Sequence, residues 1–350
     1  MNIKEFQQNI LQWYEENHRI LSWRENKEPY RVLVSEIMLQ QTRVDTVIPY
    51  FERFMDWFPT VDDFANAGEE KILKSWEGLG YYSRVRNLHS AVKEIAETYN
   101  GIVPNTKEEI SKLKGIGPYT AGAVLSIAYD KPEPAVDGNV MRVYSRIFKI
   151  EEDIAKPASR KIFEQKVHET ISHDDPSSFN QGLMELGAMI CTPTSPKCAE
   201  CPVNKHCVAF KEGIQDNLPI KSKKKKGKTI QYIAVLVEND KGNLLIQKRP
   251  SKGLLAGLWE FPIYELTDTN ELQLQLKLDF EDQFDMELTN IKPIGQVKHI
   301  FTHLIWDVQV FSAQILQMKN KGIWVSEVEL TNYTLPIPMQ KMLELFVYQN

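Results

Sequence analysis

The chain has 350 residues, 42% hydrophobic and 25% charged, a balance that predicts two or three globular domains with hydrophobic cores. Its formal net charge of −5, taken alone, argues against a nucleic-acid partner, because polyanion-binding domains are usually basic. No apolar run reaches the roughly 18 residues of a membrane span, and four cysteines are too few for a disulfide scaffold. We therefore expect a monomeric cytoplasmic protein without a signal peptide or membrane contact.

The charge is unevenly distributed along the chain. Residues 1–220 carry 26 basic and 32 acidic side chains, and residues 231–350 carry 10 and 15. Between them, residues 221–230 hold six lysines and no acidic residue. Two mildly acidic blocks are thus joined by a basic segment without hydrophobic periodicity, and we expect residues 216–228 to form a solvated linker.

Residues 1–215 are predicted to be mainly helical. Apolar residues recur at helical spacing near the N-terminus, within 32–39 and within 88–95. Glycines and prolines separate these segments, and the period-2 alternation of half-buried strands is missing from the sequence. This pattern favours an all-α lobe with short connections.

In the N-terminal region, Glu36 lies in the segment SEIMLQQT, among apolar residues of an expected helix. Burial raises the pKa of a carboxyl group, and a raised pKa suits a general acid that works near neutral pH. A glutamate on a helix more often faces solvent. The sequence leaves both interpretations open for Glu36.

Two further motifs follow in the helical region. The segment LKGIGPYTA places Gly115 and Gly117 in a tight turn before a helix, whose free N–H groups could bind a phosphate, although an ordinary helix–helix turn has the same composition. The segment VDGNV then presents Asp137. A fixed carboxylate can stabilise the positive charge that develops on a sugar when an N-glycosidic bond breaks, although Asp-Gly is also a common turn.

All four cysteines lie within 17 residues, in the spacing C-x6-C-x2-C-x5-C: Cys191, Cys198, Cys201 and Cys207. Four thiolates on a tight loop can bind a [4Fe–4S] cluster. A structural zinc site is the alternative, but it more often uses two C-x2-4-C pairs, and only one such pair is present. We expect the cluster.

After the linker the pattern changes to that of a smaller α/β domain. A β-branched run at 232–237, a turn at 239–243 and a second run at 244–248 predict a hairpin. Further expected elements are strands at 296–300, 304–311 and 322–325 and a helix at 336–348. Residues 229–350 are therefore expected to fold as one domain.

Together these motifs resemble the MutY family of adenine DNA glycosylases, within the endonuclease III (helix-hairpin-helix) superfamily. The resemblance covers nearly the whole chain through SEIMLQQT, GLGYYSR, LKGIGPYTAG, VDGNV, the cysteine spacing and GLWEFP. It implies a two-lobed helix-hairpin-helix domain over 1–215 with a [4Fe–4S] loop at 191–207, and a Nudix-like domain over 229–350. The implied partner is double-stranded DNA, in which adenine opposite 8-oxoguanine or guanine is flipped out and removed. A cytoplasmic protein associated with the nucleoid is therefore expected.

The resemblance also assigns roles to individual residues. Glu36 would protonate the adenine, and Asp137 would stabilise the sugar cation. Tyr119 stands where relatives that also cleave the backbone carry a Schiff-base lysine, which implies a monofunctional enzyme, and it would hydrogen-bond to this pair of carboxylates. Asn139 would orient Glu36 or the catalytic water. The remaining implied contacts to DNA or the base are Arg24, Gln41, Thr42, Leu79, Tyr81, Gly115, Gly117, Phe301, Thr302 and His303, and for Leu79 a core position is equally expected.

Two other functions remain open at this level. A related glycosylase could prefer a mismatched thymine or an oxidised pyrimidine, and a non-catalytic damage-binding protein could share the fold. Glu36 and the C-terminal domain argue against the first alternative, and Glu36 together with Asp137 argues against the second. Because the Glu-rich Mg²⁺-binding motif of Nudix hydrolases is missing from the sequence after Pro262, pyrophosphohydrolase activity is not expected.

Overall fold

The structure, a computed structural model, describes residues 1–223, 227–267, 271–317, 319 and 321–348. It divides into two compact units. The first comprises Met1–Ala67 and Ser83–Lys223, and the second comprises Gly68–Tyr82 and Lys224–Asn350. In the part of the chain that is described, no helix combines the length and apolarity needed to cross a bilayer.

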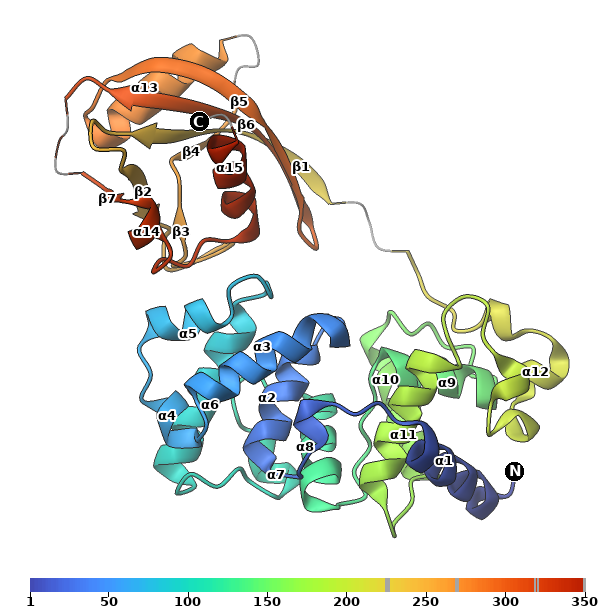
Figure 1. Ribbon diagram of the computed structural model, residues 1–350. Helices are drawn as coiled ribbons and strands as arrows, with labels where there is room; N and C mark the ends of the chain where they lie inside the picture. Colours follow the sequence, from blue (N-terminus) through green and yellow to red (C-terminus); the bar gives the residue numbers. More distant parts are fainter. Residues whose placement is uncertain (224–226, 268–270, 318, 320, 349–350) are drawn as a thin grey trace. The chain divides into compact units, whose positions relative to one another are not determined.

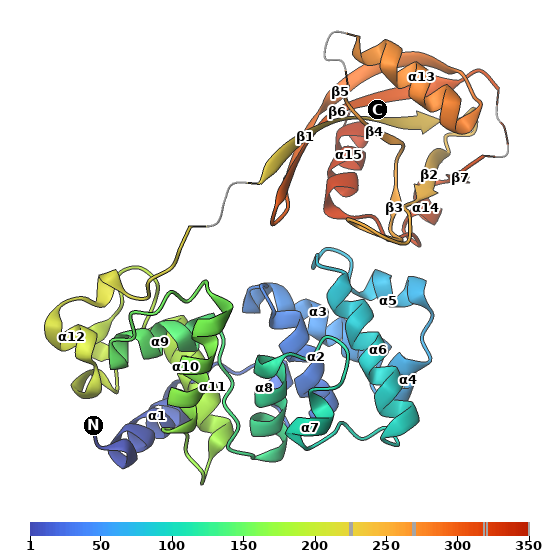
Figure 2. The same ribbon diagram turned by 180° about the vertical axis from the view of Figure 1, so that it is seen from behind.

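The first unit is built from helices joined by short connections (Figure 1). They are α1 (Ile3–Asn17), η1 (Ser22–Arg24), α2 (Pro29–Leu39), α3 (Val44–Trp57), α4 (Val61–Ala65), α6 (Ser83–Thr98), α7 (Lys107–Ile110), α8 (Pro118–Tyr129), α9 (Gly138–Phe148), η2 (Pro157–Ser159), α10 (Arg160–His168), α11 (Pro176–Met189), η3 (Cys198–Glu200), η4 (Asn204–His206), α12 (Val208–Glu212) and η5 (Gln215–Asn217). Helices α2–α4 and α6–α8 gather in one group and α1 and α9–α12 in another, in both Figure 1 and Figure 2. The expected two-lobed helical fold is confirmed.

Local sequence fixes where these helices start. Proline occupies the first turn of α2, α8 and α11, where a missing N–H is tolerated. Asp137 caps α9, and its side chain accepts a hydrogen bond from Val140 N. In the core of one lobe, α1 lies so close to α11 that a Cβ added to Gly182 would be 2.9 Å from Ile10 Cγ2. The proline at the start of α8 and the Asp137 cap of α9 therefore fix where these two helices begin.

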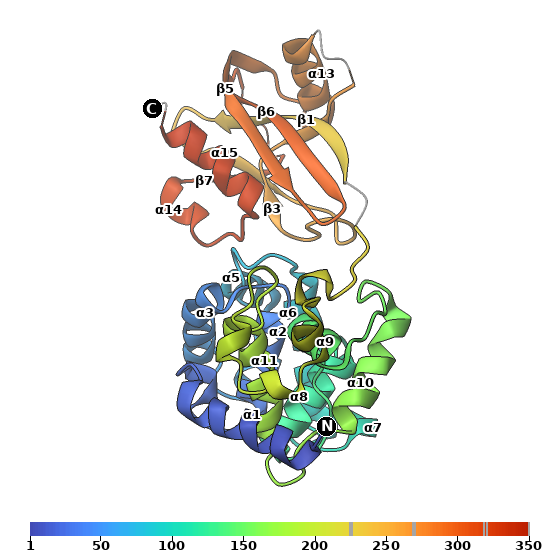
Figure 3. The same ribbon diagram turned by 90° about the vertical axis from the view of Figure 1, so that its right-hand side faces the viewer.

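The second unit contains a seven-stranded mixed sheet. Its strands are β1 (Lys228–Glu238), β2 (Leu244–Lys248), β3 (Trp259–Glu260), β4 (Ile263–Glu265), β5 (Leu288–Ile300), β6 (Leu304–Ile315) and β7 (Ile323–Val325). The order is β3-β2-β1-β6-β5, with β4 also paired to β1 and β7 to β2. Strands β1 and β6 are parallel, and the long antiparallel pair β5–β6 is prominent in Figure 3.

Two helices cover opposite faces of this sheet (Figure 2). Helix α15 (Ile337–Val347) packs on the face that carries Ala234 and Leu236, and α13 (Leu272–Phe284) packs on the face that carries Ile233 and Val235. The alternating residues of β1 therefore serve two cores, as expected for a strand covered on both sides. The unit also contains α14 (Glu327–Leu330) and α5 (Glu69–Ser75).

The segment Gly68–Tyr82 is held to the rest of the second unit by polar contacts. Glu70 of α5 pairs with Lys248 Nζ at 2.6 Å and accepts a hydrogen bond from Trp259 Nε1 at 3.3 Å. Glu77 accepts a hydrogen bond from Leu335 N at 2.8 Å. These bonds come from the first turn of α5 and from the segment just after its end, and they fix its position on this unit.

The predicted hairpin is confirmed, with Glu238 of β1 opposite Leu244 of β2. Strands β5 and β6 are longer than the sequence indicates, and helix α13 has no counterpart among the expected elements. Strand β1 starts beside the loop before β6. Lys228 N donates to His303 O at 3.2 Å, and a Cβ on Gly227 would lie 2.9 Å from the His303 carbonyl carbon.

The segment expected to be a linker is only partly free of the first unit. Leu218 is buried, Ile154 N donates to Ile220 O at 3.0 Å, and Ser222 N donates to Asp153 Oδ1 at 3.1 Å. The lysines at 224–226 lie outside the described residues.

Candidate active site

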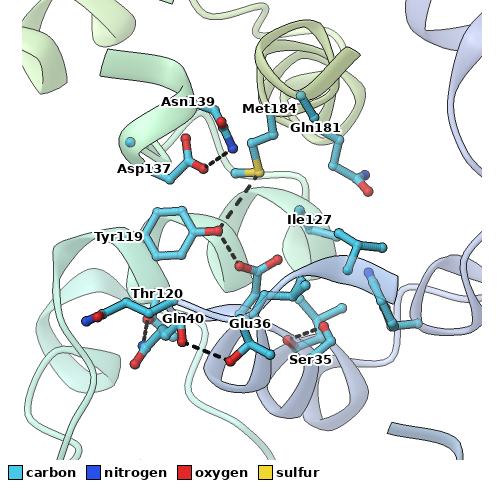
Figure 4. Close-up of a pocket in the computed structure, with 18 of the residues that line it drawn as sticks. Ser35, Glu36, Gln40, Tyr119, Thr120, Ile127, Asp137, Asn139, Gln181 and Met184 are labelled. Carbon is cyan, nitrogen blue, oxygen red and sulfur yellow. Dashed lines mark hydrogen bonds between the residues drawn. The ribbon is translucent and has the colours of Figure 1, made fainter. Parts of the chain in front are cut away.

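A pocket of about 900 Å³ opens in the first unit, a size typical of ligand sites. Its walls come from η1, the C-terminal half of α2, the turn and first residues of α8, the start of α9 and one side of α11. Glu36 and Asp137 lie in the same pocket with Tyr119 between them (Figure 4). All three titratable groups come from motifs that the sequence singles out: SEIMLQQT, LKGIGPYTA and VDGNV.

Glu36 is buried in the middle of α2, with 5% of its surface exposed. Its Oε2 accepts a hydrogen bond of 2.5 Å from the Tyr119 hydroxyl. Burial raises the pKa of Glu36 to about 7, the Tyr119 hydrogen bond opposes this, and the charge of Asp137 adds to it. The side chain can therefore carry a proton near neutral pH, so the buried interpretation holds for Glu36.

Tyr119 lies in the first turn of α8, just after the glycine turn. Its hydroxyl is also 4.0 Å from Met184 Sδ of α11 (Figure 4). Burial raises the pKa of Tyr119 well above its usual value, so the phenol stays protonated and serves as a hydrogen-bond donor. The expected bond between Tyr119 and the carboxylates is confirmed for Glu36.

Asp137 is held at the N-terminus of α9. Its Oδ1 accepts from Val140 N at 2.7 Å, and its Oδ2 accepts from Asn139 Nδ2 at 2.8 Å. Burial raises the pKa of Asp137, and these two hydrogen bonds lower it. Asn139 thus contacts Asp137, two residues before it at the same helix start, and its expected role in orienting Glu36 or the catalytic water stays a prediction.

Three residues that the sequence did not indicate support this pair. Arg142 Nη2 donates to Asn139 Oδ1 at 2.9 Å and to Gly187 O at 2.7 Å, while its Nε donates to Cys191 O at 2.7 Å. At Gly187 a Cβ would lie 2.6 Å from Asn139 Cβ. The glycine therefore lets α11 approach Asn139 closely. Arg142, Gly187 and Met184 are identified only by their contacts in the structure, since none of them stands out in the sequence.

Arg24, an expected base contact, lines the pocket at the end of η1. Its Nη2 is 2.9 Å from Glu185 Oε1 of α11, and Arg19 binds the same carboxylate. Neither Arg19 nor Glu185 was expected to belong to the site. Arg19 and Arg24 each lie more than 160 residues from Glu185 in the chain, so no local sequence pattern reveals the contact.

The four cysteines line one small apolar cavity beside Arg146. Arg146 is fully buried and donates to Cys191 Sγ at 3.3 Å and to backbone carbonyl groups, such as Thr192 O at 2.7 Å. Among the described residues no carboxylate pairs with this guanidinium, and a buried cation so placed fits an anionic thiolate centre. Burial raises the pKa of the Cys201 thiol to about 12, so ligation depends on a metal that displaces the proton.

The arrangement bears on the expected cluster and on zinc, its alternative. A zinc ion needs its thiolates at about 2.3 Å from one centre, whereas thiolates around a four-iron cluster bind separate iron atoms. All four cysteines line one apolar cavity, which fits a cluster with one thiolate on each iron atom.

The sequence was also compared with known proteins. Residues 34–169 match the HhH-GPD superfamily of base excision DNA repair proteins, residues 191–207 match the iron-sulfur binding domain of endonuclease III, and residues 233–345 match the NUDIX domain. The chain is 36% identical to the adenine DNA glycosylase of Buchnera aphidicola subsp. Schizaphis graminum, over 99% of this chain and 100% of that protein. It is 32% identical to the adenine DNA glycosylase of Schizosaccharomyces pombe, over 94% of this chain and 87% of that protein. The chain belongs to the adenine DNA glycosylase family.

Membership establishes the reaction class. The protein is a hydrolase of base excision repair that acts on adenine in DNA, and its cofactor is the iron–sulfur cluster held by the four cysteines. Among solved structures, a thermostable thymine-DNA glycosylase is similar with a TM-score of 0.55 and 28% identity, over 60% of this chain and 97% of that one. The helical fold is therefore shared with a glycosylase of different base preference.

The expected DNA contacts of the first unit lie around the mouth of the same pocket. Gln41, Thr42, Gly115 and Gly117 all line it. Gly115 adopts a φ of +82°, and a Cβ there would lie 2.7 Å from Asn87 Cβ, so the turn requires glycine at this position. Gly117 caps α8 at an ordinary φ of −92°. Nothing lies within 4 Å of where its Cβ would be, which leaves room for a ligand.

The expected contacts of the second unit differ in exposure. Leu79 is buried at 7% exposure, so the core interpretation describes it better than a wedge between bases. Tyr81 is exposed, and its hydroxyl is 2.9 Å from Thr302 Oγ1. Phe301 packs edge-to-face on Trp306, with ring centroids 5.1 Å apart. This packing anchors the loop and leaves Thr302 and His303 exposed to solvent.

Proposed function

We propose that this enzyme removes adenine mispaired with 8-oxoguanine, and with guanine, after the adenine has been flipped from the duplex into the pocket described above. The observation that carries the proposal is the pair of carboxyl groups on one cavity, with Glu36 buried and Asp137 half-buried. Glu36 can hold a proton near neutral pH, and Asp137 is fixed by Val140 N and Asn139.

The two carboxyl groups have separate tasks in this mechanism. Glu36 donates its proton to the adenine ring, which turns a poor leaving group into a neutral one. As the glycosidic bond stretches, positive charge builds on the deoxyribose, and the fixed Asp137 carboxylate stabilises it. Tyr119 holds Glu36 in position, and water then attacks the sugar carbon.

The positions of these groups support base flipping. Glu36 is buried and Tyr119 is half-buried in the pocket, and a base stacked inside a duplex cannot reach them. Removal of the base requires that the nucleotide rotate out of the helix and enter the cavity.

The site favours hydrolysis without strand cleavage. Cleavage by a Schiff base needs an amine next to the sugar. Position 119 carries a tyrosine, and no lysine is found among the described residues that line the pocket. We therefore propose a monofunctional enzyme that leaves an intact abasic strand.

The second unit supports recognition of the opposite base. Thr302 and His303 are exposed on a loop anchored by Phe301, and Tyr81 reaches that loop through its hydroxyl. Hydroxyl and imidazole groups can hydrogen-bond to the added oxygen and ring N–H of 8-oxoguanine. A matched pair of duplexes, with 8-oxoguanine or guanine opposite adenine, measures this contribution.

Single-turnover base release on a duplex panel tests the proposal. The panel contains adenine opposite 8-oxoguanine, guanine and cytosine, and thymine opposite guanine. We expect release of adenine from the first two only, with strand breaks appearing only after alkali treatment. Faster release of thymine, or breaks without alkali, would contradict the proposed specificity or the proposed monofunctional reaction.

Three variants assign the residues. Asp137→Asn and Glu36→Gln should each lower the rate by about 10²- to 10⁴-fold while duplex binding persists. Glu97→Gln, which changes an exposed glutamate of α6, is the matched control and should behave as wild type.

A further inference from the structure

Glu185 of α11 is a buried carboxylate that the mechanism above does not use. Its side chain is 1% exposed, and both of its oxygens accept hydrogen bonds from arginines. Arg19 binds it through Nε to Oε2 and Nη2 to Oε1, both at 2.8 Å, and Arg24 Nη2 adds a third bond to Oε1 at 2.9 Å. A carboxylate as buried as this one needs such partners to offset its desolvation.

The two arginines belong to the pocket as well as to this ion-pair cluster. Arg19, Arg24 and Glu185 line the same cavity as Glu36 and Asp137. The Arg24 guanidinium also donates from Nη1 to Arg19 O at 3.1 Å. No acceptor among the described residues binds Arg19 Nη1 or Arg24 Nε, so both groups keep a donor available to a bound nucleotide.

We propose that Glu185 is a positioning residue for base release, which fixes Arg24 and Arg19 at the pocket wall and offsets their positive charge close to Glu36. Without Glu185, two guanidinium groups would repel each other and face the proton donor uncompensated. This inference rests on the proposed role of Glu36 as the acid.

The charges around Glu36 predict the direction in which its pKa should move when Glu185 is removed. The charged and titratable groups around Glu36 are Tyr119 from α8, Asp137 before α9, Arg19 and Arg24 from the η1 region, Arg43 and Asp45 at the start of α3, Arg84 from α6, Arg160 from α10, and Glu185 itself. The charge of Arg24 lowers the pKa of Glu36. Removing Glu185 makes the surroundings more positive, which stabilises ionised Glu36, so the enzyme should lose its protonated acid at a lower pH.

The test is the pH dependence of single-turnover adenine release by Glu185→Gln, measured beside duplex affinity. We expect the alkaline limb of the profile to move down by about half to one pH unit, as for loss of a neighbouring charge. The rate above neutral pH should then fall about three- to tenfold, whereas the acidic limb changes little. Duplex affinity should be unchanged or tighter, because the variant carries one negative charge less.

Opposite changes of charge supply the controls. Arg19→Gln removes a cation from a side chain that is 36% exposed and should move the limb upward, and the double variant Glu185→Gln/Arg19→Gln should return it toward wild type. The matched control Glu97→Gln should leave the profile unchanged. If Glu185→Gln does not fold or lacks its iron–sulfur cluster, Arg19→Gln alone tests the inference.

Two results would overturn the inference. One is a uniform loss of rate or of duplex affinity in Glu185→Gln without movement of the limb, which is what a purely structural ion pair predicts. The other is an unmoved limb in Arg19→Gln. Failure of the underlying mechanism is distinguishable, because Glu36→Gln would then retain activity and an alkaline limb whatever Glu185 does.

Discussion

Gly187 tests whether Asn139 must hold Asp137 in place. In Gly187→Ala the new Cβ would meet Asn139 Cβ at 2.6 Å and the Asn139 Cα and carbonyl carbon at 3.3 Å. Carbon atoms in good contact are about 3.5–4.0 Å apart, so about 1 Å of overlap must be relieved. Part of the obstacle is backbone, which cannot rotate away, so we expect Asn139 and the start of α9 to move.

The size of the effect follows from that displacement. A misplacement of about 1 Å at a reacting group can lower a rate by about 10²-fold, so adenine release should fall by about that factor. Overpacking should also lower the free energy of unfolding by about 1–3 kcal/mol, partly offset by about 1 kcal/mol from the better helix propensity of alanine. Duplex affinity should stay the same, because the change lies behind Asp137.

Gly182→Ala is the matched control in the same helix. Its Cβ would meet Ile10 Cγ2 at 2.9 Å, on the face of α11 that packs against α1. It should therefore reproduce the loss of stability in thermal unfolding without the loss of rate in single-turnover assays. If Gly187→Ala releases adenine within about twofold of Gly182→Ala, the positioning of Asp137 by Asn139 is not needed and our reasoning is wrong.

Three further predictions concern Glu36, Arg142 and the basic segment. The rate of adenine release should fall above about pH 7, because the pKa of Glu36 is raised to about 7 and the protonated acid is lost as the pH passes it; a rate that is flat from neutral to alkaline pH would contradict this role. Arg142→Ala removes three hydrogen bonds, to Asn139, Gly187 and Cys191, and should slow adenine release in single-turnover assays by about tenfold or more while duplex binding persists; an unchanged rate would show that Asn139 is held without it. Neutralising Lys223 to Lys226, three of which lie outside the described residues, should weaken binding to any duplex and flatten its salt dependence, and unchanged affinity would leave the segment as a solvated linker.

The sequence predicts those features of the site that depend on neighbours in the same helix or motif, and it does not predict contacts between distant segments. The apolar neighbours of Glu36 in the same helix already favour its burial, which the structure shows. The bond from Asn139 to Asp137 could not be predicted, since a motif shows which residues occur together but not which atoms meet. Glu185 was missed altogether because its arginines lie more than 160 residues away in the chain.

Helix α13 shows the same limit for secondary structure. Its first residues, LQLQLKL, place leucine at every second position, which resembles the pattern of a strand. The buried residues are instead Leu276, Phe280 and Phe284, spaced by four as on one helix face. Packing against the sheet selects the helix, and alternation alone could not reveal it.

The contact between Gly227 and His303 links the end of the basic segment to the exposed loop before β6. A side chain at position 227 would press on the backbone of the exposed loop, and Lys228 N is already bonded to His303 O. A larger residue at position 227 would therefore displace the loop that carries Thr302 and His303, the loop that contacts the opposite base in our proposal.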